Sequence, residues 1–180
     1  MTEALDYEKK IKNQLEVLKR IDTYIGTTNT KCTIIMSYCA AATAFIFTFL
    51  SKLEPSHAPI PLLVEIGLFS ALALIFGLWC MALAVLVIFP VTFSTPKNHK
   101  GESLIFYGDI ASSTDGGSYS EKVKQVSEED FLEDLNGQIY TLASIASDKF
   151  SRIKFATIIL MIHFGCMAGV LTGAILLYLS

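Results

Sequence analysis

The sequence predicts an all-α membrane protein with three transmembrane helices, a cytoplasmic N-terminal amphipathic helix and a cytoplasmic extension of the third span. Hydrophobic residues make up 52% of the 180 residues and charged residues 17%, against a usual charged share of about 25%. The apolar residues also form three blocks without charge, at 32–51, 66–96 and 155–180. Each block can hold the roughly 20 helical residues that cross a hydrocarbon core. Backbone polar groups in lipid must be paired within their own segment, so the blocks should be helices.

The distribution of basic residues predicts the orientation. Thirteen of the fourteen Lys and Arg residues precede the first span or follow the second, and Lys52 is the exception. The positive-inside rule then places the N-terminus in the cytoplasm and the C-terminus outside it. The first thirty residues carry charges of both signs, which argues against a signal peptide, so we expect the first span to be retained.

Local patterns divide the chain into seven segments. In order, we predict a cytoplasmic amphipathic helix (1–31), a transmembrane helix (32–51), an extracytoplasmic connection (52–61), a second transmembrane helix (62–90), a cytoplasmic loop (91–126), a cytoplasmic helix (127–155) and a third transmembrane helix (156–179). The first helix is predicted from apolar residues that recur at spacings of three and four. These are Ile11, Leu15, Leu18, Ile21 and Ile25. The first connection contains Pro55, Pro59 and Pro61, which end one helix and start the next.

The long loop and the helix that follows it carry their own signals. Segment 103–110 is apolar and bounded by turn formers, which indicates either a short strand or a buried turn. The Ser/Gly-rich stretch 112–120 is expected to be mobile. Ser127 is a candidate N-cap, because three acidic residues follow it in the first turn. With Gly137 as the only strong breaker before the third span, we predict one nearly continuous helix over 128–179.

Three glycines in the third span are candidates for close helix packing. Gly165, Gly169 and Gly173 are four residues apart, so they share a face on which a second helix can approach closely. That helix is either the first or second span of the same chain, or the third span of another copy in a homo-oligomer.

Two ionisable residues are candidates for a polar or pore-lining role. His163 lies well inside the third span, where such groups usually face the bundle interior or a water path. It is either a hydrogen-bonded packing residue or a pH- or ion-sensitive one. Glu65, near the outer end of the second span, either sits at the membrane interface or contributes to a ring of carboxylates that favours cations.

Catalytic and metal-binding motifs are not apparent in the sequence. Asp109, Asp115 and Glu121 have no histidine partner or ligand pattern, and there is no P-loop or nucleophile elbow. The four cysteines lie in or beside apolar segments, which is typical of inert packing thiols. The net charge of −3 gives no reason to expect binding to genomic nucleic acid. We therefore expect no enzyme activity, metal or tightly bound cofactor.

Three stretches carry a resemblance to a known family. The first is Asn29-Thr-Lys31-Cys32, where that family tends to have Asp-x-Lys-Ala. The others are Ser103-Leu-Ile-Phe-Tyr-Gly-Asp-Ile110 and the segment from Asp134 to Phe150. The chain resembles the Pycsar effector family in these stretches and in the order of its segments. Members of this family are small membrane proteins of bacterial anti-phage defence. The Hailong-type channel effector is a related possibility.

The resemblance implies an effector that depolarises or damages the bacterial inner membrane under the control of a nucleotide. The signal would be a cyclic mononucleotide or an oligonucleotide made by a neighbouring cyclase or nucleotidyltransferase, and it would either activate or inhibit. The sensing site would lie among the N-terminal helix, segment 103–110 and helix 127–155. Its candidate residues are Asn29, Lys31, Tyr107, Asp109, Gln138, Tyr140 and Lys149.

The resulting hypothesis is a ligand-gated channel formed by several copies of the chain, with four copies expected, because three spans alone do not enclose a water path. The alternative is a non-conducting membrane anchor or adaptor that recruits a soluble partner through its cytoplasmic helices. A membrane-embedded enzyme is disfavoured, because it would need paired polar residues within the spans.

Overall fold

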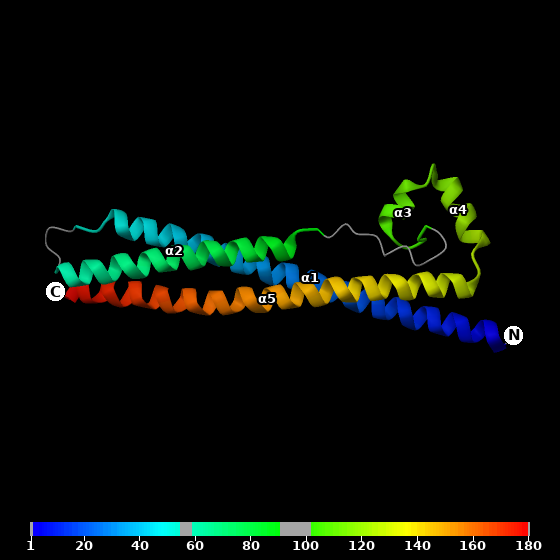
Figure 1. The fold of residues 1–180 in the computed structure, drawn as a ribbon, viewed down its shortest axis with the longest axis horizontal. Coiled ribbons are helices and arrows are strands. Elements are labelled where there is room, and N and C mark those ends of the chain that lie inside the picture. Colours follow the sequence, from blue (N-terminus) through cyan, green and yellow to red (C-terminus); the bar gives the residue numbers. More distant parts are fainter. Residues whose placement is uncertain (1, 55–58, 91–101, 180) are drawn as a thin grey trace. The chain divides into compact units, whose positions relative to one another are not determined.

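The computed structural model describes residues 2–54, 59–90 and 102–179, which form five helices and, within these ranges, no strand (Figure 1). The helices are α1 (Thr2–Ser51), α2 (Ile60–Ile88), α3 (Tyr107–Ser112), α4 (Gly116–Gln125) and α5 (Glu128–Leu179). Three of them, α1, α2 and α5, are long and apolar enough to cross a membrane. The predicted all-α membrane fold is thus confirmed. Pro55 and most of the first third of the predicted cytoplasmic loop lie outside the described residues.

The chain folds as two compact units. The first unit comprises residues 1–26 and 90–148, and the second comprises 27–89 and 149–180. Helix α5 contributes to both, because it runs without a break from Glu128 to Leu179, as the sequence predicts.

The second unit is a bundle of α1, α2 and α5 whose buried residues follow a period of 3.5. In α2 the buried residues are Ile66, Ser70, Ala73, Gly77, Cys80, Ala84 and Val87. In this part of α1 they are Thr28, Cys32, Ile35, Cys39, Ala42 and Ile46. In α5 every seventh residue from Lys149 to Val170 is buried. Alternating steps of three and four are the spacing of a left-handed coiled coil, so the helices pack with interlocking side chains.

Small side chains let the helices of the second unit approach closely. A Cβ atom added to Gly169 would lie 2.5 Å from the ring of Phe69, and one added to Gly173 would lie 2.6 Å from Ile66. The thiol of Cys80 donates to the backbone oxygen of Ala156 across 3.4 Å. All four cysteines are buried and free, in agreement with the prediction of packing thiols.

In the first unit, part of the sequence prediction for the loop was wrong. Segment 103–106 is a half-buried turn that leads into α3, so the strand alternative for 103–110 does not hold. The stretch predicted to be mobile, 112–120, contains the first half of α4. The cause is a local cap, because the Asp115 carboxylate accepts a hydrogen bond from the Ser118 backbone N–H at 2.7 Å and so satisfies a free amide of the first turn.

The start of α5 and the first half of α1 largely follow the sequence signals. Ser127 Oγ accepts from the Asp130 backbone N–H at 3.0 Å, which confirms the predicted N-cap. In α1 the less exposed face includes Ile11, Gln14 and Leu18, whereas Leu15 is exposed. The prediction for Leu15 was wrong. The buried residues in the second half of α1 repeat every 3.5 residues on average, and the same repeat continued into the first half places Gln14, not Leu15, on the less exposed face.

Candidate functional site

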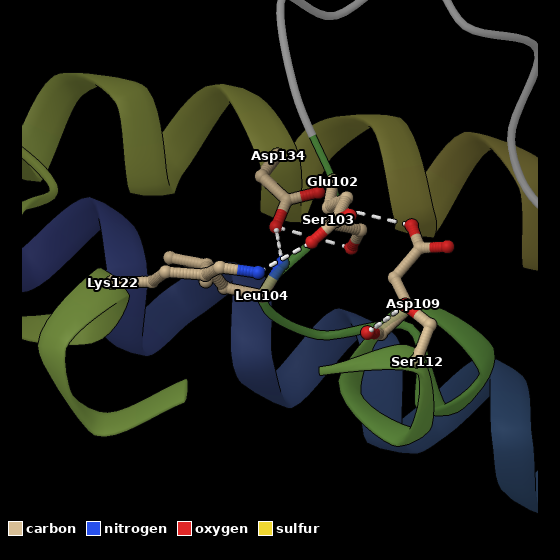
Figure 2. Close-up of polar contacts among 7 residues, drawn as sticks. All are labelled: Glu102, Ser103, Leu104, Asp109, Ser112, Lys122 and Asp134. Carbon is tan, nitrogen blue, oxygen red and sulfur yellow. Dashed lines mark hydrogen bonds and ion pairs between the residues drawn. The ribbon is translucent and has the colours of Figure 1, made fainter. Parts of the chain in front are cut away.

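Segment 102–106 is joined to α5 by hydrogen bonds that centre on Ser103 (Figure 2). The Ser103 hydroxyl donates to Asp134 Oδ2 at 3.1 Å and accepts from the Gln138 amide at 3.0 Å. It also lies within hydrogen-bond distance of the backbone N–H groups of Ile105 and Phe106, at 3.2 and 3.0 Å. One hydroxyl thus organises both the turn and its attachment to α5.

Two carboxylates complete the attachment by accepting bonds from the backbone of the turn. Asp134 Oδ2 accepts from the Leu104 N–H at 2.8 Å, and Asp109 Oδ2 accepts from the Ser103 N–H at 2.9 Å. From α4, the Tyr119 hydroxyl donates to the Leu104 backbone oxygen at 2.9 Å. Bonds that involve a carboxylate are stronger than neutral ones, so this turn is held firmly in place.

The rim of the site carries an exposed ion pair. Lys122 Nζ lies 2.5 Å from Glu102 Oε2 (Figure 2). The hydrogen bond from Lys122, together with its positive charge, lowers the pKa of the Glu102 carboxyl. Water and salt screen such exposed pairs, so their contribution to stability is small.

The predicted sensing residues of the first unit fall into two groups. Gln138 and Asp109 point inward, and both are used in holding the turn. Tyr107 and Tyr140 are 63% and 75% exposed, so their rings are available to a ligand. Aromatic faces of this kind can stack on a nucleobase.

The second unit brings together Asn29 and Lys149, which the resemblance placed in different stretches. Lys149 Nζ donates to the backbone oxygen of Val87 and to Asn29 Oδ1 at 3.3 Å. The Lys149 side chain is only 7% exposed, whereas Lys31 is exposed and does not join this contact. Lys149 therefore connects all three helices of the bundle.

His163 is enclosed in the bundle interior. Its Nδ1 atom donates a hydrogen bond to the Ala73 backbone oxygen at 2.9 Å. A Cβ added to Gly77 would lie 3.2 Å from the ring. The buried Nε2 atom has no hydrogen-bond partner among the residues that the structure describes. Glu65 is partly exposed, in the second turn of α2.

The three glycines do not share one environment. Gly169 and Gly173 lie against α2, whereas a Cβ added to Gly165 would meet nothing within 4 Å. The reason is that each step of four residues rotates around the helix by about 40° more than a full turn. Gly169 and Gly173 thus pack against a helix of the same chain, and Gly165 remains available to a second copy.

Ser103 in the turn and Asp134 on α5, which form the centre of this attachment, were not among the residues predicted for a site. The available signals were a polar residue opening an apolar segment and an Asp–Gln pair one helical turn apart on α5. No group of three or more potential metal ligands occurs among the described residues.

Comparison with known proteins identifies the family. The family model for the Pycsar effector protein domain matches residues 13–179. A curated relative, Pycsar effector protein EcPycTM from Escherichia coli, is 28% identical over 161 residues, which cover 79% of this chain and 78% of that protein. No solved structure gives a significant match. The matched region contains the Ser103 attachment, the Lys149 contact and all three apolar segments, and the chain therefore belongs to the Pycsar effector family, the multi-pass membrane effectors of anti-phage defence.

Proposed function

We propose that this effector forms a homo-oligomeric ion channel that a nucleotide signal gates, and that its opening depolarises the bacterial inner membrane. The observation that carries the proposal is the continuity of α5. The same helix holds the 102–106 turn through Asp134 and Gln138 and, further on, forms the third apolar span. A ligand that changes the attachment of the turn therefore acts directly on a helix that enters the membrane.

Conduction is proposed to require several copies. The interior of the described bundle is filled by interlocking buried side chains, which leaves no room for an ion path along one copy. Large apolar residues on all three spans remain exposed in the single chain, so each copy has surface for lipid and for its neighbours. We propose a tetramer with Gly165 at the contact between copies and Glu65 at an outer ring that favours cations.

The proposed ligand-binding residues of the first unit are Tyr107 on α3 and Tyr140 on α5, whose rings are exposed. The exposed rings suit a base, and the family membership favours a cyclic mononucleotide or an oligonucleotide from a neighbouring cyclase or nucleotidyltransferase. Binding would shift the population between closed and open arrangements by the difference in affinity for the two. The proposed orientation has the N-terminus in the cytoplasm, which puts this site on the side where such a signal is made.

The first experiment measures the membrane potential of growing bacteria with a voltage-sensitive dye after induced expression of the chain. Depolarisation by the chain alone indicates an inhibitory signal, and depolarisation only upon co-expression with the neighbouring nucleotide-making enzyme indicates an activating one. Purified protein in liposomes then tests whether ion flux needs no other component. Absence of flux in liposomes, with and without the nucleotide, would overturn the channel and favour the non-conducting adaptor.

Variants of one tyrosine test the ligand site. Tyr107→Ala should abolish the response to the nucleotide, whereas Tyr107→Phe, which keeps the ring, should retain it. If Tyr107→Ala responded to the nucleotide as well as Tyr107→Phe does, Tyr107 would not be part of the ligand site.

A further inference from the structure

Two polar residues occupy core positions on α5, and their spacing matches the spacing of their contacts on α2. His163 and Lys149 are 14 residues apart, and so are Ala73 and Val87, whose backbone oxygens they contact. The two helices run in opposite directions (Figure 1), so both contacts form in a single register. Fourteen residues are two heptads, which keeps both polar residues on the buried face.

Each of these contacts fits only one register. The His163 ring rests on Gly77, and a slip of one heptad would bring the side chain of Ser70 or Ala84 to that place. Val87 lies in the last turn of α2, where backbone oxygens lack partners within the helix. A slip that moves Lys149 deeper by one heptad would place the ammonium opposite Cys80, at the centre of an apolar segment.

The two contacts differ in how easily they can be released. His163 is 1% exposed and lies in the middle of the bundle. Lys149 lies at the residue where α5 passes from the first unit to the second. Its described hydrogen-bond acceptors are both uncharged, an amide and a backbone oxygen. A buried charge that lacks an opposite charge is poorly compensated for its desolvation, so release of Lys149 from the bundle would recover the hydration of its ammonium group.

The Lys149 contact also stabilises the end of α2. That helix has no basic residue of its own in its last turn. A cation near the C-terminus of a helix is favourable because the free backbone oxygens there carry partial negative charge. Lys149 supplies this cation from α5, so its departure would loosen the end of α2 and also free Asn29 in the middle of α1.

We infer that Lys149 and His163 form a two-point register lock between α5 and α2, in which His163 is the permanent point and Lys149 is a latch that opens during gating. The lock itself follows from the contacts, and its part in gating rests on the proposed channel function. Movement of α5 that pulls Lys149 away from Asn29 and Val87 releases the middle of α1 and the end of α2, while His163 keeps the register.

Hydrogen–deuterium exchange of the full chain in lipid nanodiscs tests the latch without reference to conduction. Lys149→Met keeps much of the volume and removes the charge. We expect exchange in the last turn of α2 and around Asn29 to become about 10- to 100-fold faster, the factor for losing a hydrogen bond from a charged group. Exchange around Ala73 should not change. Lys154→Met, the same change at an exposed position, is the matched control.

Conduction tests the role in gating through two changes of opposite sign. Asn29→Asp should strengthen the latch, because an ion pair replaces the neutral contact, and Lys149→Met should open it. The two variants should therefore shift the nucleotide concentration needed for half-maximal flux in opposite directions. In the Lys149→Met background, Asn29→Asp should no longer strengthen the latch.

The outcomes are separable. If Lys149→Met exchanges like Lys154→Met, the latch is wrong whatever the protein conducts. If exchange changes as expected but both variants shift flux in the same direction, the role in gating is wrong. If no form of the protein conducts, the channel proposal and the gating role fall, and exchange still decides whether the lock exists.

Discussion

The hydroxyl of Ser103 donates a hydrogen bond to the carboxylate of Asp134 across 3.1 Å, although the two residues are 31 positions apart in the chain. This bond attaches the turn before α3 to the helix that becomes the third span. Ser103 and Asp134 belong to the two stretches that resemble the family, so each stretch supplies one side of the same contact.

Removal of the Ser103 hydroxyl should loosen the turn selectively. Ser103→Ala leaves the half-buried N–H groups of Ile105 and Phe106 without their acceptor, which costs less than the roughly 1–3 kcal/mol of a fully buried group. Amide exchange at 105–106 should therefore rise sharply, while Leu104, which donates to Asp134, is affected less. Ser112→Ala is the control, because that exposed hydroxyl contacts only the Asp109 backbone oxygen. Equal effects of the two substitutions would contradict the central role of Ser103.

Two glycines of the third span should respond differently to the same substitution. Gly169→Leu would collide with Phe69, whereas a Cβ at position 165 has no atom of the described residues within 4 Å. We expect Gly169→Leu to lower the melting temperature in detergent and Gly165→Leu to leave it unchanged but reduce the size of the oligomer, measured by light scattering on a size-exclusion column. Gly67→Leu, also at an open position, is the control. A wild-type oligomer size for Gly165→Leu would exclude Gly165 from the contact between copies.

Gly77 should be required because His163 lies against it. Gly77→Ala places a methyl group 3.2 Å from the ring, and overpacking of this kind typically costs about 1–3 kcal/mol. Gly67→Ala, with nothing within 4 Å, should not destabilise the protein. His163→Ala should relieve the strain, so the double variant should be less destabilised than the sum of the single ones. Thermal unfolding of the four proteins measures this coupling, and strict additivity would show that the ring does not press on residue 77.

The Glu102–Lys122 pair should contribute little, and only above acidic pH. Because Lys122 lowers the pKa of Glu102 below its ordinary value of 4.5, the pair stabilises the folded state above that pH. The contribution is lost as the pH falls through the folded-state pKa. Both side chains are largely exposed, so salt should weaken the effect further. Glu102→Gln should lower the melting temperature slightly at pH 7 in low salt, and a difference that does not shrink as the pH falls below 4.5 would contradict the assignment.

Much of the fold was predictable because it depends on local composition. The three uncharged blocks, the N-cap at Ser127 and the unbroken helix over 128–179 can each be recognised from neighbouring residues. The errors arose where a few specific atoms outweighed composition. The Asp115 carboxylate caps α4 within a Ser/Gly-rich stretch that is typical of loops, and the tertiary anchor from Tyr119 to the Leu104 backbone oxygen holds that helix in place.

The candidate site was predictable only in part. Asp109, Gln138, Asn29 and Lys149 were selected through the resemblance. Ser103, which contacts the first two, and Val87, which contacts Lys149, were not. The glycine stripe illustrates the difficulty, since a residue without a side chain carries no sign of which helix approaches it. Gly169 and Gly173 face α2 while Gly165 does not, and this distinction depends on the rotation of α5 within the bundle.

The sequence by itself determined that the chain is a helical membrane protein with three spans, because hydrophobicity and length alone decide whether a segment can reside in lipid. Only the tertiary structure decided the register of the helices and the identity of the polar contacts between them. These depend on pairs such as Lys149 with Val87 and Ser103 with Asp134, which are 62 and 31 residues apart. No local pattern encodes such a pair, since it forms only when packing has set the rotation and depth of each helix.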